Sequence, residues 1–155
     1  MILDHALKML ERGFAVFALS PGTKIPIAGT SGFKEATRDA DIVRRWFAAC
    51  PEINYGIALA STDLVLDADP RNYPAGRDVL AECLAKNFPS GGMPVRLAVA
   101  TPAGGRHIYT TKPADLKVRK KQDQWPGIDF LSDGAYTVGP GSIVDGKAYE
   151  EITLG

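Results

Sequence analysis

The chain has 155 residues, enough for one domain with a buried core, and its 18 basic and 18 acidic side chains balance. This balance argues against a protein that coats nucleic acid by charge alone, because such proteins are usually clearly basic. We find no apolar stretch long enough to span a membrane and no signal-peptide pattern at the start. The two cysteines, Cys50 and Cys83, are too few for a four-ligand zinc site or a disulfide framework. We therefore expect reduced thiols in a cytoplasmic protein.

The first part of the chain shows helical and then strand-like patterns. Apolar positions with helical spacing predict a helix over residues 3–12, and residues 14–19 then form a short buried strand. A second helix is expected to begin at Asp39 or Asp41, since either residue suits an N-cap.

The rest of the chain is expected to be mostly strands. The apolar runs at residues 55–59 and 64–68, with turn residues between them, predict a hairpin, and residues 79–88 predict a third helix. A second hairpin turns at residues 102–105. The remaining strands are expected at residues 95–100, 107–111, 128–131, 136–138 and 148–152. The fold class is therefore α+β with a mainly antiparallel sheet.

An aspartate pair, Asp67 and Asp69, closes the apolar run at residues 64–68. Residues i and i+2 of a strand point to the same side, so the two carboxylates are expected to project together. Adjacent carboxylates repel each other unless a cation lies between them, and oxygen ligands suit Mg²⁺ or Mn²⁺. The alternative is that the pair ends a strand and caps the turn that begins at Pro70.

Two further segments carry residues suited to phosphate chemistry. Arg106 and His107 follow a glycine-rich turn, and both side chains can bind phosphate oxygens. The alternative is an ordinary hairpin with a surface arginine and a half-buried histidine. Asp129 lies between apolar residues of a predicted strand, where an aspartate is usually paired or metal-bound. Together, the three aspartates and the histidine form a plausible two-metal site for phosphoryl transfer.

With these motifs the sequence resembles the bifunctional DNA primase/polymerase (prim-pol) domain of the archaeo-eukaryotic primase superfamily. Such domains occur in replication proteins of plasmids, phages and other mobile elements. The resemblance covers nearly the whole chain in the expected order. The second-motif histidine falls on His107 and the third-motif aspartate on Asp129. The resembling blocks, besides the Asp-x-Asp pair, are residues 12–17, 21–26, 32–37, 42–47, 54–58, 101–109 and 127–129.

The resemblance implies a fold, a reaction and a set of roles. The fold is an RRM-like, mainly antiparallel sheet with flanking helices plus an additional N-terminal α/β unit, forming one catalytic domain over residues 1–155. The reaction is template-directed nucleotidyl transfer from NTP or dNTP with two Mg²⁺ or Mn²⁺ ions. The metal ligands would be Asp67, Asp69 and Asp129. The nucleotide would be bound by His107, helped by Arg106, Gly105 and Lys24.

The chain departs from the family at two positions. Many relatives have a serine where this chain has Gly105, and an arginine where it has Leu131. The first difference puts one phosphate contact in doubt and the second a guanidinium contact near the nucleotide. Neither removes an expected metal ligand.

The expected partners are nucleoside triphosphates, a primer and a single-stranded DNA template, with a helicase in cis or in trans and no membrane. Template contact would use a basic segment with Trp125 nearby as a base-stacking surface; the alternative is a solvated loop beside a core tryptophan. The basic residues are Lys117, Arg119, Lys120 and Lys121.

The sequence also leaves two rival functions. One is a nucleotide-binding or single-stranded nucleic-acid-binding module with little or no synthesis. The other is a metal-dependent nuclease of the rolling-circle type, which usually needs a paired-histidine metal site. The two histidines, His5 and His107, do not match that requirement.

Overall fold

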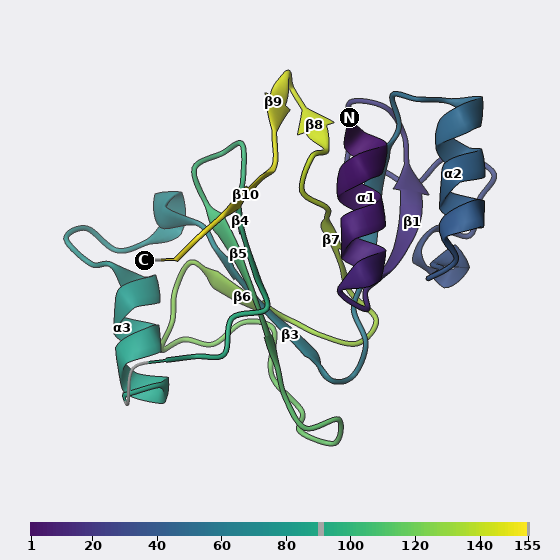
Figure 1. Cartoon of the computed structure of the whole chain (residues 1–155). Coiled ribbons are helices and arrows are strands. Elements are labelled where there is room, and N and C mark those ends of the chain that lie inside the picture. Colours follow the sequence, from purple (N-terminus) through teal and green to yellow (C-terminus); the bar gives the residue numbers. More distant parts are fainter. Residues whose placement is uncertain (90–91, 155) are drawn as a thin grey trace. The chain divides into compact units, whose positions relative to one another are not determined.

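The computed structural model describes residues 1–89 and 92–154, and their secondary structure is mixed α+β, which confirms the predicted fold class. The chain folds into two compact units (Figure 1). The first unit comprises Met1–Leu59 and Gly134–Glu150, and the second comprises Ala60–Asp133 and Glu151–Gly155. None of the helices described is both long and apolar enough to cross a membrane.

The first unit combines helices with a three-stranded sheet of order β1-β2-β7 and a two-stranded ribbon, β8-β9. Its helix α1 buries Ala6 and Met9. The helix ends before Gly13, whose positive φ of 89° suits the residue after a helix. The elements are α1 Ile2–Glu11, β1 Ala15–Leu19, η1 Gly32–Glu35, α2 Ala40–Ala49, β2 Asn54–Ala58, β7 Tyr136–Val138, β8 Ile143–Val144 and β9 Lys147–Ala148.

The start of α2 confirms one of the two predicted N-caps. The Asp39 carboxylate accepts a hydrogen bond from the backbone N–H of Asp41 at 2.8 Å. This bond satisfies one of the free N–H groups at the helix start. Val43 and Phe47, one turn apart, are the buried residues of this helix.

The second unit is built on a five-stranded sheet of order β10-β4-β5-β3-β6. The predicted β4–β5 hairpin is confirmed, since the two strands pair antiparallel and Thr101 N–H donates to the Gly105 carbonyl at 3.0 Å across the turn. The elements are β3 Asp63–Ala68, η2 Pro70–Asn72, α3 Val79–Asn87, β4 Leu97–Ala100, β5 Arg106–Thr111, β6 Ile128–Leu131 and β10 Glu150–Ile152.

The predicted hairpin between residues 55–59 and 64–68 is wrong. These runs form β2 and β3, which belong to different sheets in different units. The turn between them is real, and the Asp63 carboxylate accepts from the Ala60 N–H at 2.8 Å. Both strands are buried runs without clear alternation, so their sequence does not specify which neighbour each one pairs with. In the structure β3 pairs with β5 on one side and β6 on the other.

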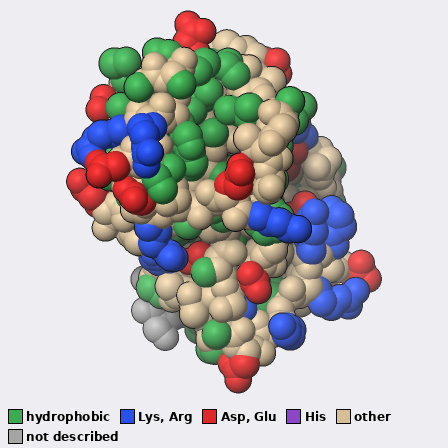
Figure 2. Space-filling view, turned by 90° about the vertical axis from the view of Figure 1, so that its right-hand side faces the viewer, with side chains coloured by type: hydrophobic (Ala, Val, Ile, Leu, Met, Phe, Trp, Pro, Cys, Tyr) green, Lys and Arg blue, Asp and Glu red, His purple; other side chains and the backbone are tan. Residues whose placement is uncertain are grey.

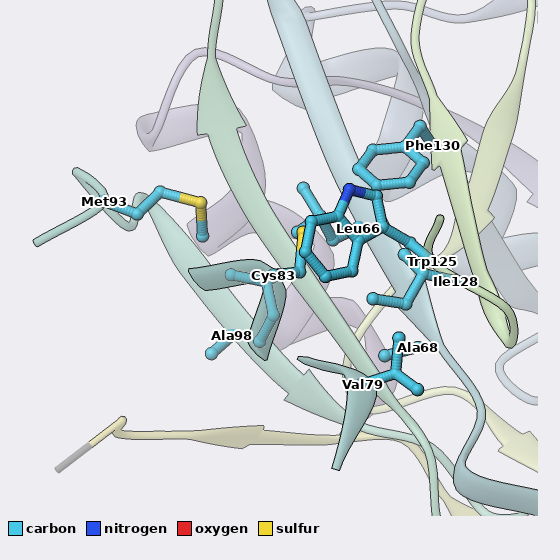
Figure 3. Packing of buried hydrophobic residues seen from close by; sticks show 10 residues of the cluster. Leu66, Ala68, Val79, Cys83, Met93, Ala98, Trp125, Ile128 and Phe130 are labelled. Carbon is cyan, nitrogen blue, oxygen red and sulfur yellow. The ribbon is translucent and has the colours of Figure 1, made fainter. Parts of the chain in front are cut away.

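One face of the five-stranded sheet carries the core of the second unit. Helix α3 supplies Val79 and Cys83, which pack with alternate residues of the strands (Figure 3). Trp125 lies in the same cluster and is only 7% exposed. Its indole is therefore a core group, so the expected base-stacking role for Trp125 is wrong. The strand residues of this cluster are Leu66, Ala68, Ala98, Ile108, Ile128 and Phe130.

Charged side chains of both signs are interspersed on the face of the molecule drawn in Figure 2. This mixture agrees with the balanced composition of the chain. Selectivity for an anionic ligand must therefore come from a local arrangement of charges.

Candidate active site

The candidate site is a row of side chains that crosses the second sheet at right angles to its strands. Strand β3 lies between β5 and β6, and its Asp67 is paired in register with His107 of β5 and Asp129 of β6. Residues directly opposite each other on neighbouring strands project from the same face, with Cβ atoms about 4.5–5.5 Å apart. Three residues that are distant in sequence are therefore immediate neighbours.

The row continues on both sides. Val99 of β4 lies opposite His107, and Lys121 forms an isolated antiparallel bridge with Asp129. The Lys121 ammonium lies 2.9 Å from Oδ1 of Asp129. On the other side of Asp67, Nε2 of His107 lies 3.4 Å from Oδ1 of the carboxylate. Two neighbouring carboxylates are thus flanked by an imidazole and an ammonium group.

The burial of these side chains suits a binding site. The His107 side chain is 9% exposed, whereas the Asp67 side chain is 37% exposed. The imidazole is therefore held in place by its surroundings, while the carboxylate can be reached from solvent. Like charges directly opposite each other weaken a sheet, and the Lys121 ammonium beside Asp129 offsets part of this repulsion between Asp67 and Asp129.

Asp69 lies one residue beyond β3, at the N-cap of η2. Its backbone N–H donates to the Gly127 carbonyl at 2.8 Å, which ties the end of β3 to the start of β6. Its carboxylate accepts from the Arg71 N–H at 3.1 Å and forms an ion pair with the Arg71 guanidinium at 2.8 Å. The guanidinium hydrogen bonds are the main reason that the pKa of Asp69 lies below its usual value. The alternative interpretation of Asp69, a cap of the following turn, is confirmed.

Two glycines fit tightly where the strands of the row end. A Cβ at Gly105 would lie 2.6 Å from the Ala68 carbonyl oxygen, and one at Gly127 would lie 2.5 Å from the Tyr73 ring. A side chain at Gly105 would therefore push β5 away from β3 beside Asp67. A serine at this position would need the two strands to move apart.

Arg106 does not lie in the row. Because strand residues alternate, Arg106 projects from the opposite face to His107, and it lines a cavity of about 800 Å³ beside α3. Arg106 therefore does not share a face of the sheet with His107, and its expected help in nucleotide binding stays a prediction. Lys24 belongs to the first unit, where its carbonyl accepts from the Tyr136 hydroxyl at 2.9 Å.

Leu131, the second departure from the family, lies on the same face as Asp129 but one row further along the strands. It is paired in register with Val65, which in turn faces Tyr109 of β5. Val65 and Tyr109 are both buried. An apolar row therefore lies beside the charged one, and Leu131 extends it.

The side chains of the row could supply only part of the ligand shell of a divalent cation. Within residues 1–89 and 92–154, no three His, Cys, Asp or Glu side chains gather closely enough to enclose a metal ion. Mg²⁺, however, usually takes only one or two protein carboxylates and completes its shell with water and substrate phosphates. The adjacent Asp67 and Asp129 carboxylates fit that requirement, whereas the Asp69 carboxylate is engaged by Arg71.

Sequence reasoning missed the two basic partners of this site. Arg71 follows its aspartate by two positions, a spacing that allows the contact but does not single it out. In the sequence, Lys121 stands out only as part of the basic segment expected to bind the template. Its contact with Asp129 depends on a bridge between segments eight positions apart, for which the sequence carries no periodic signal.

The fold and the row define an α+β domain with paired carboxylates and a histidine on one face of an antiparallel sheet. The chain matches the family model of the bifunctional DNA primase/polymerase, N-terminal (Prim-Pol), over residues 6–153. It therefore belongs to the Prim-Pol family, and the resemblance seen in the sequence is confirmed. Membership supports a primase/polymerase type of function, with nucleotidyltransferase activity in general and interaction with DNA and nucleotides. A comparison with curated proteins found no match.

Proposed function

We propose that this chain is a catalytic domain for metal-dependent, template-directed nucleotidyl transfer from NTP or dNTP, acting in the replication of a plasmid, phage or other mobile element. The observation that carries the proposal is the register of three strands, which sets Asp67 between His107 and Asp129 on one face of the sheet. The reaction joins a hydroxyl oxygen to the α-phosphorus of a nucleotide and releases pyrophosphate. A site for it needs carboxylates for cations and a donor for phosphate oxygens.

Each residue of the row has a role that its surroundings support. Asp67 and Asp129 would hold Mg²⁺ or Mn²⁺, and Asp69 would join them once its carboxylate leaves Arg71. A bound divalent ion supplies positive charge that favours loss of the hydroxyl proton and stabilises the leaving pyrophosphate. His107, held by its buried position, would donate a hydrogen bond to a triphosphate oxygen. The proton of the attacking hydroxyl would pass to solvent.

Template and primer contact would rest on the basic segment before β6. Lys117, Arg119 and Lys120 are all exposed, so their side chains can approach a phosphodiester backbone. A helicase, in cis or in trans, would supply the single-stranded template.

The test is incorporation of labelled dNTP and NTP on primed and unprimed single strands with Mg²⁺ or Mn²⁺. We expect Asp67→Asn and Asp129→Asn to lower incorporation by about 10²-fold or more, as expected when charge stabilisation of the transition state is lost. The matched control is Asp133→Asn, which changes an exposed aspartate of the same unit. Full incorporation by the Asp67 and Asp129 variants would refute the proposed site.

The second candidate function is a module that binds nucleotides or single-stranded nucleic acid with little or no synthesis. The observation that favours it is the Arg71 ion pair, which occupies one of the three expected metal ligands. A binding module would retain affinity for single strands while showing no incorporation with either metal ion. The same assay, run with a filter-binding measurement on the same strands, separates the two functions.

A further inference from the structure

Two of the three carboxylates in the candidate site already have a cationic partner. The Arg71 guanidinium lies 2.8 Å from the Asp69 carboxylate, and the Lys121 ammonium lies 2.9 Å from that of Asp129. Asp67, which lies opposite Asp129 and two residues before Asp69, has the His107 imidazole at a longer distance of 3.4 Å. The basic residues therefore occupy two of the three carboxylates that divalent ions would bind in the proposed function.

Both ion pairs are of a kind that can open. The Arg71 side chain is 67% exposed and the Lys121 side chain is 78% exposed. Exposed ion pairs are weak because solvent screens them and because long side chains lose freedom when they are held in one geometry. A divalent ion that binds two carboxylates at once competes well against such a pair.

The net charge of the site indicates where the displaced Arg71 and Lys121 side chains would go. Three carboxylates against one guanidinium and one ammonium leave the site with a small negative charge. Adding divalent ions alone makes the site positive, with both basic groups still close by. Adding a triphosphate restores the balance, since its oxygens can accept hydrogen bonds from the released guanidinium and ammonium groups.

We propose that Arg71 and Lys121 are exchange partners of the active-site carboxylates: they neutralise Asp69 and Asp129 in the metal-free state and move to the triphosphate when metal and nucleotide enter together. This inference rests on the proposed function and deepens it. It names two triphosphate-binding residues that lie outside the three sequence motifs. It also implies that metal and nucleotide bind cooperatively, and such coupling is reciprocal by thermodynamic linkage.

The test measures Mn²⁺ binding from the electron paramagnetic resonance signal of free Mn²⁺, with and without a non-hydrolysable dNTP. A titration of Mn²⁺ with the nucleotide alone corrects for their direct complex. The proteins are the full chain and its variants Arg71→Gln, Lys121→Gln, Lys121→Arg and Asp67→Asn, with Lys86→Gln as the matched control. Lys86 is an exposed lysine of the same unit that lies over the Trp125 ring, and the structure shows no ion pair between it and a carboxylate among the residues described.

We expect Arg71→Gln and Lys121→Gln to bind Mn²⁺ alone roughly 3- to 10-fold more tightly, because a competing cation has been removed. The enhancement of Mn²⁺ binding by nucleotide should fall by a similar factor. Lys86→Gln should behave as the unmodified chain does, and the charge-conserving Lys121→Arg should restore the coupling. Thermal unfolding of each variant shows that the fold is retained.

Two results would overturn the inference, and only the second would also overturn the proposed function. If Mn²⁺ binds at Asp67 and Asp129 with the same affinity and coupling in all variants, the exchange idea is wrong and the proposed function stands. If Mn²⁺ does not bind, or binds unchanged in Asp67→Asn, the proposed metal site fails as well.

Discussion

The two faces of the five-stranded sheet differ in what they contain, although the same strands build both. On one face, Leu66 and Ile108 pack with α3 and Trp125 in an apolar core. On the other, Asp67, His107 and Asp129 lie side by side in a row. Along β3 a change of face takes one residue, from Leu66 to Asp67, because strand side chains alternate.

This difference shows how the fold supports a costly arrangement of charges. The core face holds the strands in register, and that register forces two carboxylates together on the opposite face. The charged row depends on the core for its geometry, while the core does not depend on the row for its packing. Changes on the two faces should therefore have separable effects on stability and on activity.

The largest effect is expected from a change on the core face. Ile108→Ala removes a fully buried side chain from the core cluster and should lower the free energy of unfolding by about 2–5 kcal/mol. Urea denaturation followed by circular dichroism measures it. The control is Leu116→Ala, half-exposed in the same unit, which should stay within about 0.5 kcal/mol. Equal losses for both variants would contradict the assignment of the core face.

The next-largest effect is a difference in activity between variants of His107 and Arg106, which are neighbours on β5. His107→Ala should lower single-nucleotide extension by about 10²-fold, because the imidazole that faces the carboxylate row is lost. Arg106→Ala should lower single-nucleotide extension by less than about 3-fold, since the Arg106 side chain projects from the opposite face of the sheet. Extension rates at saturating nucleotide compare the two. An equal loss for Arg106→Ala would restore the role that the sequence suggested for it.

A smaller effect concerns the stability of the charged row. Asp67→Asn removes one of two like charges that face each other across β3 and β6. Lys121 already pairs with Asp129, so only part of the repulsion remains, and without metal we expect the variant to be more stable by about 0.2–0.5 kcal/mol although its incorporation is lowered. Thermal unfolding in a chelating buffer measures the change. A clear loss of stability would mean that Asp67 has a structural role that outweighs the repulsion.

The smallest effect concerns the two thiols. Burial on the core face raises the pKa of the Cys83 thiol above its usual value of 9.0, which keeps it protonated at neutral pH. Cys50 is only half-buried. A thiol reagent at pH 8 should therefore label Cys50 first and Cys83 only slowly, with a rate that rises at higher pH. Mass spectrometry of the labelled peptides distinguishes the sites, and rapid labelling of Cys83 would contradict its placement in the core.

The sequence predicted the local features of this fold well. The helices, the Asp39 N-cap and the β4–β5 hairpin depend on neighbouring residues, whose spacing and turn chemistry are visible in the sequence. The partner of β3 was predicted wrongly, because a buried strand without alternation carries no mark of its neighbours.

The candidate site likewise has features that are visible in the sequence and features that depend on long-range strand pairing. The family motifs predict that Asp67, His107 and Asp129 share one site, whereas the strand register that makes them neighbours is a property of the fold. Simple alternation was enough to predict that Arg106 and His107 lie on opposite faces, but the phosphate-binding chemistry of both residues obscured it. Lys121 meets Asp129 through a bridge that only the folded chain reveals.

The most direct test of the central claim is a crystal of the full chain soaked with Mn²⁺ and a non-hydrolysable dNTP. Our account predicts anomalous Mn²⁺ density between the carboxylates of Asp67 and Asp129, with the His107 imidazole within hydrogen-bond distance of a phosphate oxygen. Nucleotide bound without Mn²⁺ at these carboxylates, and away from His107, would contradict it.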